Sequence, residues 1–174
     1  AWGESNAVAF CNSMLGARTN RYGDFLDIAC ALVGRAPRYG LHLAENRLAT
    51  LVIDATRLPD RLCALDAFWP VLGAFLGRAA GERVAVVDGV AAHATEDRLK
   101  ALGAAAASFG AVGLFHVAGV TPEAPTLAAA VGGVFCGDHA GGTSNLRASA
   151  RRSRHQALES VSALWRTVKS VSWR

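Results

Sequence analysis

The sequence predicts an α/β fold in which a parallel β-sheet is flanked by helices. Three short runs of apolar and β-branched residues, at 48–55, 82–89 and 111–120, have the length and composition of buried strands. Segments whose apolar residues recur at helical spacing, at 61–77 and 95–110, separate these runs. Strands that alternate with helices through short connections are typical of parallel sheets covered by helices.

The helices are predicted from their end signals. In the first 40 residues we expect helices at 7–15 and 25–33, the second ended by Gly34 and Pro37. The segment 61–77 is predicted to be helical, but Pro70 should kink or split it, because proline removes a backbone hydrogen bond.

The next helix has clearer end signals. Thr95 is the predicted N-cap, acidic residues follow it in the first turn, and Gly110 ends the helix.

Composition limits the class of protein. The chain has 174 residues, of which 52% are hydrophobic, so one globular domain is expected. From position 139 to the end there are seven Lys or Arg residues and one Glu, a net charge of +6, which leaves −2 for the preceding 138 residues of a chain with a total of +4. The basic character therefore belongs to the C-terminal segment.

The cysteines and the hydropathy pattern favour a cytoplasmic, soluble protein. Cys11, Cys30, Cys63 and Cys136 are widely separated, with no CxxC spacing, and are interpreted as free thiols. No apolar run approaches the roughly 20 residues that span a bilayer, so no membrane partner is expected.

Two polar loops are candidate ligand sites. The loop after the third predicted strand places Thr121 and Glu123 where ligands gather in parallel sheets. The alternative is a turn and N-cap before a short helix at 124–130. In the loop "GARTNRYGD", Arg18 and Arg21 present two guanidinium groups whose forked donors suit a carboxylate or phosphate. The alternative there is an ordinary solvated loop.

Four stretches, in this order, resemble the aconitase X family: "WGESNAVAF", "NSMLGARTNRYGDFLDI", "GLHLAENR" and "DRLKALGAAAASFGAVGLFHVAGVTPEAPT". The likeness covers residues 1 to about 133. It implies an aconitase-type catalytic region, hydro-lyase (dehydratase) activity, and iron or an iron–sulfur cluster held by cysteines. Known activities of the family include dehydration of cis-3-hydroxy-L-proline and of mevalonate 5-phosphate, and the first is the expected one here.

The resemblance also assigns expected roles. Dehydration of a hydroxyproline needs a base for the proton α to the carboxylate and a Lewis acid, such as iron, that helps the hydroxyl to leave. Arg18 and Arg21 are expected to hold the substrate carboxylate. The other expected substrate-site residues are Ser5, Asn6, Thr19, Asn20, His42, Thr121 and Glu123. Cys30 is the candidate metal ligand, with a packed helix position as the alternative, and no residue is assigned as the catalytic base.

The match predicts an interior piece of a larger enzyme. Residues 1–133 are expected to be a fragment of the catalytic region, and 134–174 a basic, Ser/Arg-rich tail of unclear origin, with seven serines and six arginines after position 138. Family members also have an upstream cysteine motif and continue further, so this chain alone is expected to be inactive.

The expected partners are a small hydroxy-acid substrate and the small swivel subunit or domain of the same enzyme. The tail has no fold or aromatic pattern for binding nucleic acid, so no such partner is expected. Two alternatives remain: a mevalonate 5-phosphate dehydratase-like hydro-lyase, and a non-catalytic α/β domain whose polar loops bind small anions.

Overall fold

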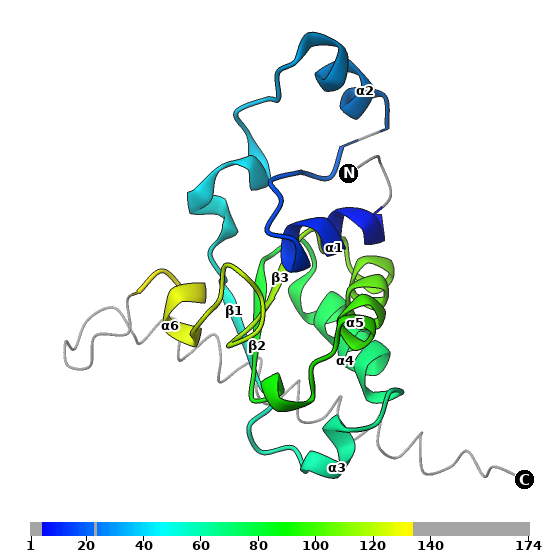
Figure 1. Cartoon of the computed structure of the whole chain (residues 1–174), viewed down its shortest axis with the longest axis vertical. Helices are drawn as coiled ribbons and strands as arrows, with labels where there is room; N and C mark the ends of the chain where they lie inside the picture. The colour runs from blue at the N-terminus through cyan, green and yellow to red at the C-terminus, as the bar shows by residue number, and fades with distance from the viewer. Residues whose placement is uncertain (1–4, 23, 134–174) are drawn as a thin grey trace, which may run out of the picture. The chain divides into compact units, whose positions relative to one another are not determined.

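A computed structural model describes residues 5–22 and 24–133, and Ser5 and Asp24 only in their backbone (Figure 1). The chain divides into two units, Ala1–Phe135 and Cys136–Arg174, and all of the described residues belong to the first. Cys136 and the segment predicted to be a basic tail lie outside the described residues.

A three-stranded parallel sheet forms the centre of the first unit. The strands β1 (Leu51–Asp54), β2 (Ala85–Asp88) and β3 (Phe115–Val117) lie in the order β1-β2-β3. In the register, Val86 pairs with Val52 on one side and with His116 on the other. The predicted parallel α/β fold is therefore confirmed, with each strand shorter than the apolar run that predicted it.

The helices follow the predicted order along the chain. They are α1 (Ser5–Met14), α2 (Asp24–Val33), α3 (Asp60–Cys63), α4 (Phe68–Ala80), α5 (Glu96–Phe109) and α6 (Leu127–Ala130), with short 3₁₀ turns η1 (Gly40–His42), η2 (Ala44–Arg47) and η3 (Ala91–His93). Thr95 caps α5 as predicted, since its side chain accepts a hydrogen bond from the Arg98 backbone N–H.

The break predicted at Pro70 lies elsewhere. The helical segment is interrupted between α3 and α4, before the proline, and Pro70 is the third residue of α4. A proline is tolerated there because the first turn of a helix has no intrahelical acceptor for its N–H groups. The prediction of a break was right, and the prediction of its position was wrong.

The two faces of the sheet pack against different helices (Figure 1). Ala85 and Val87 lie in the larger apolar cluster, with side chains of α4 and α5 that include the fully buried Trp69. Val86, which points to the opposite face, lies in a smaller cluster with Ala130 of α6. This alternation is what the period of a β-strand requires when both faces are covered.

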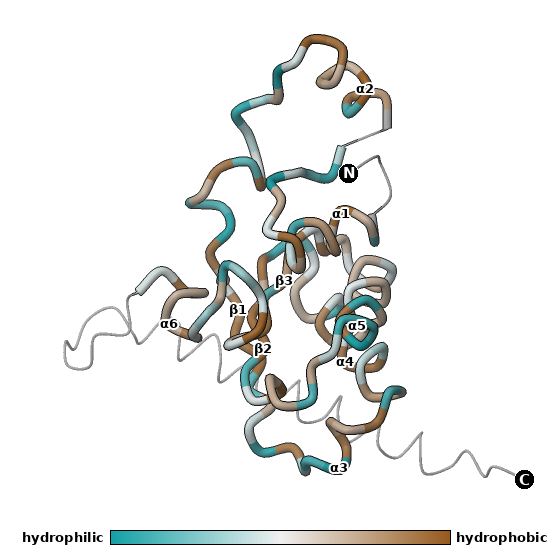
Figure 2. Tube along the Cα trace, in the orientation of Figure 1, coloured by the Kyte–Doolittle hydropathy of each residue, from teal (hydrophilic) through white to brown (hydrophobic). Residues whose placement is uncertain are grey.

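Helix α2 has no such cover from the residues that the structure describes. Phe25 and Leu32 have exposed fractions of 86% and 82%, and Figure 2 shows apolar positions along this helix. No helix among the described residues has the length and apolar character needed to cross a membrane.

Glycines allow α4 and α5 to approach closely. A Cβ atom at Gly73 would lie 2.2 Å from the Leu102 carbonyl oxygen, and one at Gly77 would lie 2.6 Å from that of Ala106. Contacts of that length force atoms apart, so the spacing of the two helices depends on these glycines.

We predict that Gly73→Ala lowers the free energy of unfolding in urea by ~1–2 kcal/mol, because the cost of overpacking exceeds the gain in helix propensity. Val71→Ala, at a 40% exposed position of the same helix, is the control and should change that free energy by less than ~0.5 kcal/mol. An equal or higher stability for Gly73→Ala would contradict the predicted packing.

Candidate functional site

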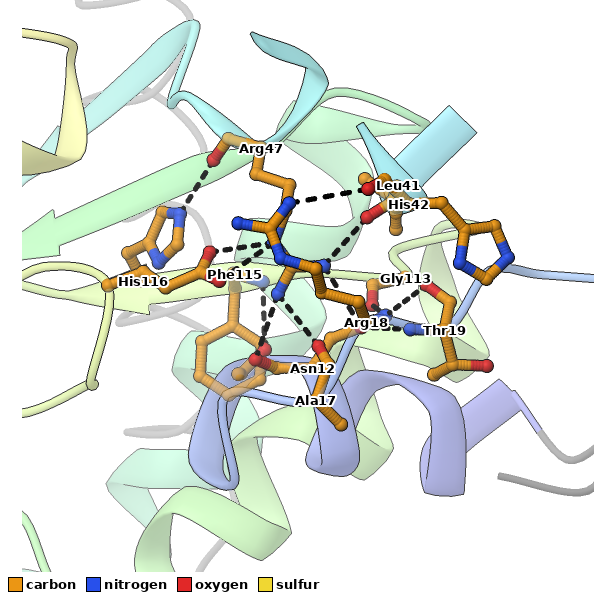
Figure 3. A network of polar contacts seen from close by, with 12 residues as sticks. Asn12, Ala17, Arg18, Thr19, Leu41, His42, Arg47, Gly113, Phe115 and His116 are labelled. Atoms are coloured by element: carbon orange, nitrogen blue, oxygen red, sulfur yellow. Dashed lines mark hydrogen bonds and ion pairs between the residues drawn. The ribbon is translucent and has the colours of Figure 1, made fainter. Parts of the chain in front are cut away.

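The guanidinium group of Arg47 is the centre of a buried polar network (Figure 3). Arg47 is only 3% exposed. Its Nε donates to both carboxylate oxygens of Glu123, at 2.9 and 2.7 Å. Its Nη1 donates to Leu41 O at 2.9 Å and Asn12 Oδ1 at 3.1 Å, and its Nη2 donates to Ala17 O at 3.0 Å and Asn12 O at 3.3 Å. Every nitrogen of this buried cation therefore has an acceptor.

Asn12, on α1, connects Arg47 to the polar loop that the sequence analysis singled out. Its Oδ1 accepts the Thr19 N–H at 3.0 Å, and its Nδ2 donates to Thr19 O at 3.1 Å. The same amide nitrogen donates to Gly113 O at 2.9 Å, just before β3. Asn12 thus fixes the loop backbone against the sheet.

His116 joins the network from β3. Its Nε2 lies 2.8 Å from the Arg47 carbonyl oxygen. Because a carbonyl only accepts, Nε2 carries the proton, and Nδ1 is buried with no partner among the described residues. Burial lowers the pKa of this imidazole below its ordinary 6.5, an effect that the hydrogen bond to Arg47 and the nearby Glu123 carboxylate partly offset. His116 is therefore held neutral.

The polar loop lies against η1. Arg18 is exposed, and its Nη1 donates to His42 O at 3.3 Å. The His42 ring stacks on Tyr22, with ring centroids 5.6 Å apart. Gly40 has a φ of +57°, and a Cβ there would overlap the Asn20 amide. The structure thus brings together four predicted site residues: Arg18, Thr19, Asn20 and His42.

Two polar atoms beside this group have no hydrogen-bond partner among the described residues. His42 Nε2 and the Tyr22 hydroxyl are both buried, and neither makes a hydrogen bond within the described part of the chain. Buried polar groups normally have partners, so these two atoms are available to a ligand or to further protein.

Arg21 is directed elsewhere. Its Nη2 lies 3.6 Å from Glu82 Oε1, ahead of β2. With Tyr22 it lines a cavity of about 470 Å³ beside the end of α5. The two arginines that the sequence analysis pairs therefore have different partners in the structure.

The loop after β3 folds back on itself. Thr121 Oγ1 accepts the Val117 N–H at 3.1 Å and lies 3.3 Å from Val117 O, so this hydroxyl closes a turn. Glu123 pairs with Arg47, which precedes β1. Thr126 caps α6 by accepting the Ala129 N–H. The turn and short helix considered as the alternative are thus formed, and the roles of Thr121 and Glu123 toward a substrate stay predictions.

Of the remaining predicted residues, neither Asn6 nor Cys30 takes part in this network. The side chain of Ser5 is not described, and exposed Asn6 accepts the Ala7 N–H with its own Oδ1. Cys30 is a partly buried residue of α2. Within 5–22 and 24–133 no three His, Cys, Asp or Glu side chains gather as metal ligands. These residues therefore do not form a ligand set for an iron–sulfur cluster.

Comparison with known sequences identifies the family. A sequence model described as the aconitase X first domain matches residues 1–45, and one described as the aconitase X second domain matches residues 49–154. The chain belongs to the aconitase X family. The second match continues past residue 133, where the sequence analysis places the end of the resemblance.

Several dehydratases are similar in sequence to this chain over most of its length. The chain is 50% identical over 133 residues to the cis-3-hydroxy-L-proline dehydratase of Pseudomonas aeruginosa, covering 76% of this chain and 22% of that protein. It is 50% identical over 140 residues to the enzyme of the same name from Hypocrea jecorina, covering 78% and 23%. It is 50% identical over 124 residues to the phosphomevalonate dehydratase large subunit of Methanothermobacter thermautotrophicus, covering 71% and 29%.

A solved aconitase X structure shares the fold. The holo-form from Thermococcus kodakaraensis superposes with a TM-score of 0.62 at 42% identity, covering 71% of this chain and 31% of that chain. The chain thus spans between about a fifth and a third of the length of these relatives.

Sequence reasoning assigned no substrate, metal or catalytic role to Arg47, Asn12, Tyr22 or His116. Arg47 and Asn12 lie in the stretches that carry the aconitase X resemblance, which was the only available signal. Arginine and asparagine are mostly exposed in proteins, so nothing in their type predicts burial.

The neutral His116 predicts a pH dependence. The unfolded chain takes up a proton near pH 6.5 and the folded chain resists it, so the free energy of unfolding should fall as pH drops below 6.5. One such group contributes at most ~1.4 kcal/mol per pH unit. His116→Gln, whose amide can still donate to Arg47 O, should lose this contribution.

Urea unfolding at a series of pH values measures the effect. The control is His93→Gln, at a partly exposed position of η3, which should keep the dependence of the parent chain. If the free energy of unfolding falls equally steeply with decreasing pH below 6.5 in the parent and in His116→Gln, the pH dependence does not come from His116.

Proposed function

We propose that this chain is part of a hydro-lyase of the aconitase X type that removes water from cis-3-hydroxy-L-proline. The observation that carries the proposal is the 50% identity over 133 residues to the Pseudomonas aeruginosa dehydratase of that name. Because the chain spans 22% of that protein, the proposal concerns the part of the site that these residues supply.

The polar loop is the proposed substrate-binding part. Elimination of water from a 3-hydroxy acid requires loss of the proton α to the carboxylate, so the carboxylate must be held in a fixed orientation. Arg18 is exposed, and its Nη1 donates one hydrogen bond to the His42 backbone carbonyl at 3.3 Å. Its other N–H groups remain as donors for a carboxylate. Arg21 lines the neighbouring cavity, where it adds positive charge.

Cofactor, partner and compartment are proposed from the same likeness. We expect iron or an iron–sulfur cluster in the assembled enzyme, with Cys30 as the candidate ligand among the described residues and with the other ligands supplied from outside them. Relatives such as that of Methanothermobacter thermautotrophicus are named large subunits, so a small subunit or domain is the proposed protein partner. The cytoplasm is the proposed compartment.

One alternative substrate has support of its own. The identity to the Methanothermobacter thermautotrophicus large subunit is also 50%, over 124 residues. Mevalonate 5-phosphate carries both a carboxylate and a phosphate, and arginine forks bind either group. Both substrates therefore belong in the test.

A chimaera tests the proposal. Residues 1–133 of this chain replace the matching segment of the Pseudomonas aeruginosa dehydratase, and turnover of both compounds is measured. We predict dehydration of cis-3-hydroxy-L-proline. Arg18→Lys in the chimaera should raise KM about tenfold, because the charge remains and the forked donor is lost.

Matched measurements make the result decisive. Arg38→Lys, at an exposed arginine outside the polar loop, is the control and should leave KM unchanged. A folded, metal-loaded chimaera that turns over mevalonate 5-phosphate instead would support the alternative substrate. A folded, metal-loaded chimaera that turns over neither compound would contradict the hydro-lyase proposal. The remaining hypothesis would then be a non-catalytic domain whose polar loops bind small anions.

The isolated 174-residue chain is predicted to have no dehydratase activity. A cluster needs several converging thiolates, and the described residues bring no such group together. Anaerobic reconstitution with iron and sulfide, a metal assay and a turnover assay measure this, and turnover by the chain alone would contradict it.

A further inference from the structure

Arg47 lies between the two aconitase X domain matches, which end at residue 45 and begin at residue 49. Its guanidinium binds Asn12, Ala17 and Leu41 in the first match and Glu123 in the second. One buried side chain therefore binds groups of both domain matches, beside the hydrogen bonds that join Asn12 to Gly113 O and the Phe115 N–H to Ser13 Oγ.

The positive charge of Arg47 is balanced by Glu123. The Arg47 side chain is 2% exposed, and its Nε lies 2.7 Å from Glu123 Oε2. Loss of one partner of a buried ion pair leaves an uncompensated charge, which is strongly destabilising for the groups around it. Both oxygens of Glu123 accept from the same Nε, so this carboxylate is committed to Arg47.

The network holds the backbone on both sides of Arg18. Ala17 O accepts from Arg47 Nη2. Thr19 exchanges two hydrogen bonds with the Asn12 side chain, whose Oδ1 also accepts from Arg47 Nη1. The exposed Arg18 side chain therefore extends from a short backbone segment, and hydrogen bonds fix this segment on both sides of Arg18 (Figure 3).

We infer that Arg47 is a positioning residue: charge-balanced by Glu123 of the second domain, it fixes the first-domain loop that presents Arg18 to the substrate carboxylate. Glu123 acts through Arg47 and does not touch the substrate. The inference rests on the proposed function for the role of Arg18, whereas the fixing of the loop can be tested without it. Preorganised binding groups lower the cost of ordering when a ligand binds.

Amide hydrogen exchange on the full 174-residue chain tests the fixing of the loop. Arg47→Lys keeps the charge and removes the forked donors. We expect the Thr19 amide to exchange about tenfold faster, the size of one lost charge-assisted hydrogen bond, while the β2 amides keep their rates.

Two further variants keep the test decisive if Arg47→Lys unfolds the chain. Glu123→Gln preserves an acceptor and removes the charge, and it should also speed exchange at Thr19 alone. Arg98→Lys is the matched control, since Arg98 binds a carboxylate, Asp66, and the backbone carbonyls of His93 and Ala64. This control should leave Thr19 exchange unchanged. Equal acceleration at Thr19 and in β2 for Glu123→Gln, or none at either, would overturn the inference.

The second readout is a double-mutant cycle in the chimaera. If Arg47 acts by positioning Arg18, then Arg18→Lys should raise KM about tenfold in the parent and by less than about twofold in the Arg47→Lys background. Independent effects on KM would overturn the role of Arg47 as a positioning residue. An inactive chimaera would count against the proposed function alone, because the exchange experiment judges the loop without any turnover.

Discussion

The structure depends on the burial of one arginine. A guanidinium group that is removed from water must have its charge balanced and its donors satisfied. Arg47 meets both requirements with groups from α1, the polar loop, η1 and the segment after β3. These segments come from both aconitase X domain matches, so Arg47 helps to hold the first-domain loop against the second-domain sheet, together with the hydrogen bonds from Asn12 to Gly113 O and from the Phe115 N–H to Ser13 Oγ.

The polar contacts of the amino-terminal segment gather at one edge of the sheet. Arg47, Glu82 and Gly113 each precede a strand of the parallel sheet, so the contacts of the amino-terminal segment lie toward the amino ends of the strands. Sequence reasoning placed the candidate ligand loop at the carboxyl ends, the usual site in such sheets. In the structure, Glu123 of the loop after β3 instead pairs with Arg47. A buried cation is strongly destabilising without a counter-charge, whereas the turn itself forms without an exposed carboxylate.

Local patterns predicted most of the fold and only part of the site. The succession of strands and helices and the Thr95 cap follow from neighbouring residues, which is why they could be predicted from the sequence. The break assigned to Pro70 was misplaced because proline fits the first turn of α4. The burial of Arg47 could not be predicted, since its partners Asn12 and Glu123 lie 35 and 76 residues away in the sequence. Burial of a polar side chain by such distant partners has no local signal.

A structure of the chimaera with cis-3-hydroxy-L-proline bound tests the central claim most directly. The account predicts that the substrate carboxylate accepts hydrogen bonds from the Arg18 guanidinium, while Arg47 remains buried between Asn12 and Glu123. A bound substrate whose carboxylate is held elsewhere, with Arg18 still on the His42 carbonyl oxygen, would contradict it.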